Sequence, residues 1–170
     1  MRIPLLLAIV LTATACSTTA DLPDALMSTT GTSPDAAMET LDIPAELADS
    51  DTAMVVVGDR TLLLAIADSP ALRARGLMGV TDLGNLDGML FYWRHEADGG
   101  FWMKDTLIPL DIVWFLEDGS YAGRASMVPC TDDPCPTYSP EGDPDYRYAI
   151  EARPGALDWI DASTRIIYSD

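Results

Sequence analysis

The segment MVVVGDRTLLLAIA, residues 54–67, decides the fold of this chain. Residues 54–57 and 60–67 are almost wholly apolar, which is typical of buried strands. Gly58–Asp59 lies between the two runs, and a two-residue connection of this kind indicates a tight β-hairpin. Leucine and isoleucine alternate onto one face of the second run, at Leu62, Leu64 and Ile66. The segment therefore predicts a hairpin within a β-rich domain.

A short helix and further strands are expected after this hairpin. In SPALRARG, residues 69–76, Ser69 can cap a helix, Pro70 suits its first turn and Gly76 can end it. Strands are expected at Met89–Trp93, Phe101–Met103, Leu110–Leu116, Ser120–Val128, Arg147–Ala152 and Thr164–Tyr168, with a helical turn at Pro154–Ile160. Many short strands joined by turns predict a mainly β (α+β) fold. We expect a compact antiparallel sandwich or partly open barrel with one or two short helices.

The composition excludes some classes of function. The chain has 170 residues, of which 48% are hydrophobic, so it can build one well-packed core. Its formal net charge is −17, and a surface this acidic repels phosphate backbones. We therefore expect no nucleic-acid partner, and a protein partner remains unknown.

The N-terminus has the plan of a secretory signal peptide over residues 1–15. Arg2 precedes an apolar stretch, Ile3–Leu11, that is too short to span a bilayer. The small residues Ala13–Ala15 then precede Cys16, as in a bacterial lipobox, so we expect export and a lipid on Cys16. The lipid would anchor the protein to the outer face of the cell membrane. Ala13–Ala15 also suits an ordinary signal peptidase, which would release a secreted protein.

Residues 16–51 are expected to form a disordered acidic linker behind the lipidated cysteine. Residues 17–51 contain eight acidic side chains and neither Lys nor Arg, so self-repulsion favours an extended chain. The composition changes near Thr52, where the apolar runs begin. We therefore expect a single globular domain over residues 52–170.

Two cysteines inside the domain, Cys130 and Cys135, lie in PCTDDPCP. Export places them in an oxidising compartment, so we expect a disulfide that stiffens the surrounding loop. A zinc site would need two more ligands, and His95 is the only histidine. Alternating acids at 141, 143 and 145 suit calcium, but the glycine and distal Glu of an EF-hand loop are missing. We expect no cofactor and no metal.

The chain contains the motifs RGLM at 75–78, GMLF at 88–91, WMKDT at 102–106 and PLD at 109–111. In this order, they resemble the motifs of a prokaryotic family called domain of unknown function 192. The resemblance covers about residues 54–168, with Glu151 and Gly155 matching a later part of the pattern. It implies a compact, mostly β fold and no assigned activity. Asp105 stands where the family commonly has Asn, which alters the charge of any site there.

Polar residues embedded in these apolar motifs are the candidate site. One interpretation is structural: Arg73 or Arg75 pairs with Asp111 or Glu151, because a buried acid needs a partner. The other places the polar groups around a cleft that orients a small polar ligand. The candidate ligand-binding residues are Arg75, Trp102, Lys104, Asp105, Asp111 and Glu151.

Neighbouring aromatic residues extend the candidate site. Alternation means that Tyr92 and Trp93 cannot both point inward, nor can Phe101 and Trp102. One ring of each pair should face outward or line a groove, and exposed rings beside polar groups suit glycan stacking.

Three hypotheses for the function follow. The first is a membrane-tethered extracytoplasmic module that binds a small polar ligand or an envelope glycan. The second is a carbohydrate-active hydrolase with Asp111 and Glu151 as its acid/base pair. Its catalytic residues are otherwise unknown, and the sequence lacks the GxSxG and HExxH signatures of enzymes. The third is a structural or partner-binding lipoprotein, which a large exposed apolar patch without a polar cleft would favour.

Overall fold

The computed structural model describes residues 41–169. The expected signal peptide, the lipid on Cys16 and the linker up to residue 40 lie outside the described residues. Within residues 41–169, no helix is both long and apolar enough to cross a bilayer.

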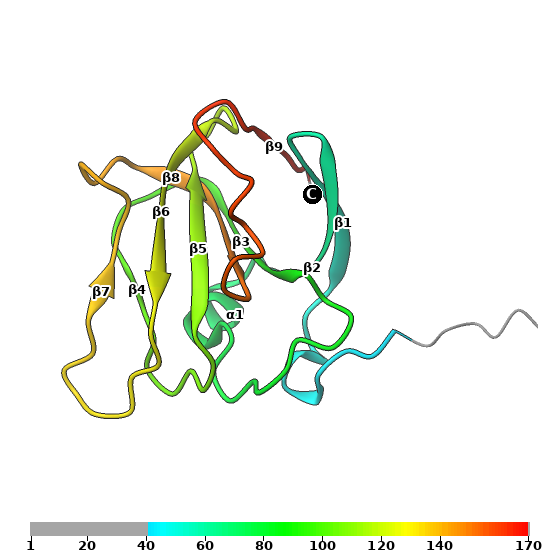
Figure 1. Cartoon of the computed structure of the whole chain (residues 1–170), viewed down its shortest axis with the longest axis vertical. Coiled ribbons are helices and arrows are strands. Elements are labelled where there is room, and N and C mark those ends of the chain that lie inside the picture. Colours follow the sequence, from blue (N-terminus) through cyan, green and yellow to red (C-terminus); the bar gives the residue numbers. More distant parts are fainter. Residues whose placement is uncertain (1–40, 170) are drawn as a thin grey trace, which may run out of the picture. The chain divides into compact units, whose positions relative to one another are not determined.

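The described residues form one curled, seven-stranded sheet and a small two-stranded sheet (Figure 1). The strand order in the large sheet is β6-β5-β8-β3-β2-β1-β9, and β4 pairs with β7 in the small one. The strands are β1 (Thr52–Val57), β2 (Arg60–Ala67), β3 (Gly88–Ala97), β4 (Phe101–Trp102), β5 (Leu110–Phe115), β6 (Tyr121–Met127), β7 (Thr137–Tyr138), β8 (Tyr146–Ala152) and β9 (Ile166–Ile167). The curled sheet confirms the mainly β, partly open barrel.

The opening hairpin is confirmed, but the sheet is not wholly antiparallel. β1 and β2 pair antiparallel with Val57 opposite Arg60, and Gly58 turns the chain with a φ of 57°. β2 and β3 instead run parallel, with Leu64 beside Gly88. The prediction of an antiparallel arrangement is wrong here because the chain crosses through α1 and a long loop between these strands, and a crossover brings it back in the same direction.

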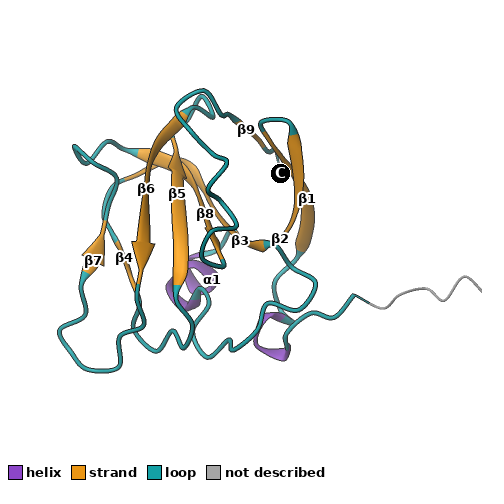
Figure 2. Cartoon of the chain, viewed as in Figure 1, coloured by secondary structure: helices purple, strands orange, loops and turns teal. Residues whose placement is uncertain are grey.

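The helix α1 (Pro70–Arg75) forms where the capping residues predict it. The Ser69 hydroxyl accepts a hydrogen bond from the Leu72 amide at 3.3 Å, and Pro70 occupies the first turn. Gly76 ends the helix with a φ of 50°, and a Cβ there would lie 3.2 Å from the Phe91 ring. The expected helical turn at 154–160 contains hydrogen-bonded turns but no helix. Among residues 41–169, Figure 2 shows helix only at α1 and at the 3-10 turn η1 (Ala45–Leu47).

Both faces of the large sheet are covered, so the domain has two apolar clusters. The α1-side core contains Met89, Phe91, Trp114 and Ala149 from the strands and Leu77 from the loop after α1. The C-terminal core lies on the opposite face and includes Leu90, Val113, Phe115, Ile150 and Leu157. Because neighbouring residues of one strand point to opposite faces, every residue of β5 is buried. This arrangement decides which polar side chains can share a site.

The expected linker ends earlier than residue 51. Leu47 in η1 is fully buried in the α1-side core, and Ile43 packs against the same cluster. The Asp42 amide donates to Asn85 Oδ1 at 2.6 Å, and Asp49 forms an ion pair with Arg75. Residues 42–50 therefore belong to the folded domain, because their few apolar side chains find a place in its core despite the acidic composition around them.

Candidate functional site

A cleft opens between α1 and β4, on the face of the sheet that carries the α1-side core. Its inner cavity has a volume of about 30 Å³, enough for one or two water molecules. An outward hollow of about 270 Å³ adjoins it. The two share Arg73, Ala74, Phe91, Phe101 and Trp102 as lining residues. Arg75, Thr106 and Glu151 line the inner cavity.

Glu151 is the most unusual group in this cleft. It points from β8 into the α1-side core, because its neighbours Ile150 and Ala152 both belong to the opposite, C-terminal core. The residue is only 4% exposed, and its carboxyl group forms no hydrogen bond or ion pair with any other described residue. Burial raises the pKa of Glu151 to about 8, so the carboxyl group is mostly protonated at neutral pH.

Arg75 lines the same cavity as Glu151, but its charge is paired with Asp49. Its two terminal nitrogens contact the Asp49 carboxylate at 2.6 and 2.8 Å, and one of them also reaches Ser50 Oγ at 3.3 Å. The hydrogen bond from Arg75 lowers the pKa of Asp49. Arg75 Nε is buried and finds no hydrogen-bond acceptor within residues 41–169. The lining of the inner cavity thus includes both a residue with an unpaired donor, Arg75, and a residue with a neutral carboxyl group, Glu151.

Aromatic rings form the outer part of the cleft. Phe101 packs inward, edge-on to Phe91 with ring centroids 4.9 Å apart, whereas Trp102 is 52% exposed. This confirms that one ring of the Phe101–Trp102 pair faces outward. Trp93 lines the outer hollow and meets Tyr146 edge-on at 5.2 Å. Tyr92 and Trp93 do point to opposite faces, and the covered sheet buries Tyr92 in the C-terminal core.

Tyr146 and Asp98 complete the outer hollow. The Tyr146 hydroxyl donates to the Gly99 carbonyl at 3.0 Å. Burial, with the nearby negative charges of Asp98 and Asp143, raises the pKa of Tyr146 to about 12. The phenol therefore stays protonated and acts as a fixed wall of the cleft.

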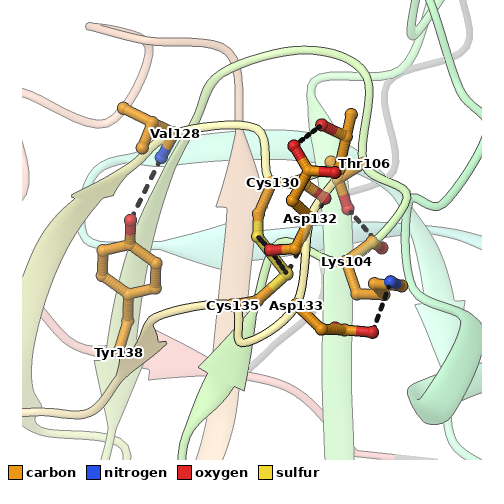
Figure 3. The surroundings of a disulfide bond; sticks show 9 residues. Lys104, Thr106, Val128, Cys130, Asp132, Asp133, Cys135 and Tyr138 are labelled. Carbon is orange, nitrogen blue, oxygen red and sulfur yellow. Dashed lines mark hydrogen bonds and ion pairs between the residues drawn. A yellow bond between two sulfur atoms is a disulfide. The ribbon is translucent and has the colours of Figure 1, made fainter.

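Two predicted site residues, Lys104 and Asp105, lie outside the cleft lining. Lys104 Nζ contacts Asp133 at 2.9 Å, beside the Cys130–Cys135 loop (Figure 3). Asp105 is exposed and has a φ of 55°. Asp and Asn both tolerate this left-handed conformation better than other non-glycine residues. The conformation therefore suits the Asp that stands at this position.

Asp111 lies on the opposite face of the sheet from Glu151. It precedes Ile112 of the α1-side core, and its carboxylate accepts hydrogen bonds from Ser126 Oγ and the Gly155 amide, each at 2.7 Å. The predicted ion pair between Arg73 or Arg75 and Asp111 or Glu151 is therefore wrong. Neutral donors satisfy Asp111, Asp49 pairs with the terminal nitrogens of Arg75, and Glu151 avoids the need for a counter-ion by staying protonated. Asp111 and Glu151 cannot flank one scissile bond.

The disulfide between Cys130 and Cys135 is confirmed, with Cα atoms 5.8 Å apart (Figure 3). Its loop is tied to the chain before β5 by the contact between Lys104 and Asp133. The Val128 amide also donates to the Tyr138 hydroxyl at 3.3 Å, next to β4. The disulfide loop thus supports the side of the cleft formed by β4 without lining it.

The remaining candidate groups do not form a site. Over residues 41–169, no three His, Cys, Asp or Glu side chains are grouped so that they could hold a metal ion. The alternating acids at 141–145 therefore do not form such a group. Exposed apolar side chains at the β1–β9 edge are Met54, Val56 and Ile167. They occur together with a polar cleft, so the hypothesis of a partner-binding protein stays a prediction.

Sequence reasoning selected Arg75, Trp102 and Glu151 as ligand-binding residues, and all three line the cleft. Its aromatic group also included Trp93 and Phe101, which line the outer hollow. It missed Asp98 and Tyr146, which carry no motif signal. It also missed Asp49, because that residue lies in a segment whose composition indicates a linker. The apolar spacing of Ile43 and Leu47 was the available signal that this segment packs.

Fold and site together define a small β-rich domain with a half-open sheet and a polar, aromatic-lined cleft. The chain belongs to the family DUF192, described as "Uncharacterized ACR", whose pattern it matches over residues 52–166. No curated protein matches the sequence significantly.

Two solved structures share the fold. One is a protein from Sinorhizobium meliloti 1021, provisionally titled a transcription regulator, with a TM-score of 0.56 and 24% identity. The match covers 69% of this chain and 95% of that one. The other is a protein of unknown function from Novosphingobium aromaticivorans DSM 12444, with a TM-score of 0.55 and 22% identity over 74% of this chain and 98% of that one. At this identity, the likeness shows the fold alone.

Proposed function

We propose that this protein is a binding module for a small, hydroxyl-bearing polar ligand, held in the cleft between α1 and β4. One observation carries the proposal: the inner cavity is lined both by Glu151, a buried acid without a hydrogen-bond partner in the described part of the chain, and by Arg75, whose Nε also lacks one there. Buried polar groups without partners are costly, and such groups gathered in a cleft mark binding sites.

The hydrogen-bonding pattern selects the ligand group. A protonated carboxyl group offers one O–H donor and a carbonyl acceptor, and Arg75 Nε offers one more donor. A hydroxyl group complements this set, because it both accepts and donates a hydrogen bond. The inner cavity of about 30 Å³ fits a hydroxyl or hydroxymethyl group, while the body of the ligand would rest against Trp102 in the hollow outside.

The place of action that we propose is the outer face of the cell membrane. The N-terminal signal and Cys16 would export and tether the protein, and the acidic segment after Cys16 would hold the domain clear of the lipid headgroups. The high negative charge supports a ligand that is neutral and not a polyanion.

The test is titration calorimetry with glycerol, glucose and N-acetylglucosamine. Glu151→Gln keeps one donor and one acceptor in the same shape, so binding should persist. Glu151→Leu removes both in a side chain of similar volume and should weaken binding about tenfold or more, the equivalent of about 1.4 kcal/mol. Equal binding by wild type and Glu151→Leu, or no binding to any of the three compounds, would contradict the proposal.

A second pair of variants examines Arg75. Arg75→Lys keeps a positive charge for Asp49 but loses Nε, so it should weaken binding with little loss of stability. Arg60→Lys is the matched control, because Arg60 stacks over Trp159 at 4.5 Å and lines neither cavity of the cleft.

A further inference from the structure

A third hollow continues the cleft beyond Trp93. It has a volume of about 390 Å³ and shares Arg73 and Trp93 with the hollow of about 270 Å³. Arg73 also lines the inner cavity, so the three spaces adjoin one another around this side chain. The exposed residues His95 and Glu96 line the far end. Neighbouring hollows therefore lie beyond the inner cavity, where further units of a ligand anchored at Glu151 can bind.

The boundary between the second and third hollows is rigidly built. Arg73 Nη1 donates to the carbonyls of Asp68 at 2.6 Å and Tyr92 at 2.9 Å. The same guanidinium lies 5.1 Å from the centroid of the Trp93 ring, which also meets Tyr146 edge-on. Because these contacts already hold the Trp93 ring in place, the ring loses little conformational entropy when a ligand packs against it.

The chemistry of the walls alternates between aromatic and polar groups. Glu151 lies at the inner end, Phe101 and Trp102 follow, Asp98 and Trp93 line the middle, and His95 and Glu96 line the outer end. Sugar rings have an apolar face that packs on aromatic rings and a rim of hydroxyl groups that bonds planar polar side chains. A chain of sugars repeats both features at each unit.

We infer that the ligand is a linear, uncharged oligosaccharide that occupies all three hollows, with a terminal hydroxymethyl or hydroxyl group in the inner cavity. This inference rests on the proposed function and names its ligand class. An extended peptide that binds as an added strand beside β3 fits the structure less well than an oligosaccharide. The pairing of β2 with β3 ends at Phe91, and Arg73 donates a hydrogen bond to the carbonyl of the next residue, Tyr92, which an added strand would need as an acceptor.

The experiment is calorimetry on the full chain with N-acetylglucosamine oligomers of one to four units, a glucose oligomer series of equal lengths, and trialanine. Affinity for at least one sugar series should rise about tenfold or more from one unit to three. The double variant His95→Ala/Glu96→Ala should remove this gain with chain length. Glu141→Ala, an exposed acid outside the hollows, should retain it.

The outcomes separate the two proposals. Sugars that bind with the same affinity at every length would overturn the oligosaccharide inference and leave the inner binding site standing. A length gain that persists in the double variant would also overturn it, as would binding of trialanine without binding of sugars. Absence of binding by every sugar would overturn both this inference and the proposed function.

Discussion

At the scale of single residues, the exposed acid Asp49 and the buried acids Asp111 and Glu151 behave differently because of their partners. Asp49 is charged and paired with Arg75, Asp111 accepts two hydrogen bonds from neutral donors, and Glu151 is buried without a partner. The sequence could show that acids lie in apolar strands. It could not show which donor each of them meets, because the partners come from segments that are distant along the chain.

Glu151 should make the domain less stable as the pH rises. Its pKa is about 8 in the folded state against the ordinary value of 4.5 for a solvated glutamate, so between these values the folded protein holds a proton that the unfolded chain releases. The contribution of Glu151 is therefore most favourable below pH 4.5 and is lost as the pH rises through 8, by on the order of 5 kcal/mol. Glu151→Gln should remove this dependence. Urea unfolding at pH 5, 7 and 9 checks it, and parallel pH curves for both proteins would contradict it.

Asp111 should act on stability and not on binding. Asp111→Ala leaves the Gly155 amide and the Ser126 hydroxyl without their acceptor, at a cost of about 2 to 3 kcal/mol. The midpoint of thermal unfolding should fall by several degrees. Asp51→Ala, at an exposed site before β1, is the matched control. If the Asp111→Ala protein were as stable as wild type but no longer bound sugar, Asp111 would instead be a ligand-binding residue.

At the scale of elements, local signals were sufficient where one segment determines its own structure. Ser69, Pro70 and Gly76 predicted α1, and Gly58–Asp59 predicted the hairpin. The parallel pairing of β2 with β3 was not predictable, because it depends on where the crossover returns the chain. Residues 42–50 were missed for a similar reason: their acidic composition indicates a linker, and only the core that they join shows otherwise.

Leu47 should therefore contribute substantially to stability. Leu47→Ala removes a fully buried side chain and should cost about 2 to 4 kcal/mol in the free energy of unfolding. Leu41→Ala is the matched control, because Leu41 is 53% exposed. Urea unfolding of the two variants decides the matter. Equal stability would mean that the domain starts at residue 52, as the composition indicates.

The disulfide should contribute modestly. The loop from Cys130 to Cys135 is short, so closing it removes little entropy from the unfolded chain, and its loss should cost about 2 kcal/mol. Thermal unfolding with and without a reductant, repeated on Cys130→Ser/Cys135→Ser, measures this. A reductant that lowers the unfolding midpoint of the double variant would point to an effect other than the disulfide.

At the scale of the whole domain, the burial of both faces of the curled sheet explains the sequence pattern of its strands and the placement of their polar residues. β5 reads as a nearly continuous apolar run because both of its faces are buried. Alternation alone would have placed half of these side chains in solvent. The same two-sided burial separates Asp111 from Glu151, and it leaves the space between α1 and β4 as the place where polar groups and aromatic rings meet.

The most direct test of the binding cleft uses the four tryptophans of the chain as reporters. Trp93 and Trp102 line the cleft, whereas Trp159 packs against the C-terminal core. In ¹H–¹⁵N NMR spectra recorded during titration with the N-acetylglucosamine trimer, the indole N–H signals of Trp93 and Trp102 should shift, and that of Trp159 should stay. A shift at Trp159 alone, or unchanged indole signals throughout the titration, would contradict the assignment of the cleft as the binding site.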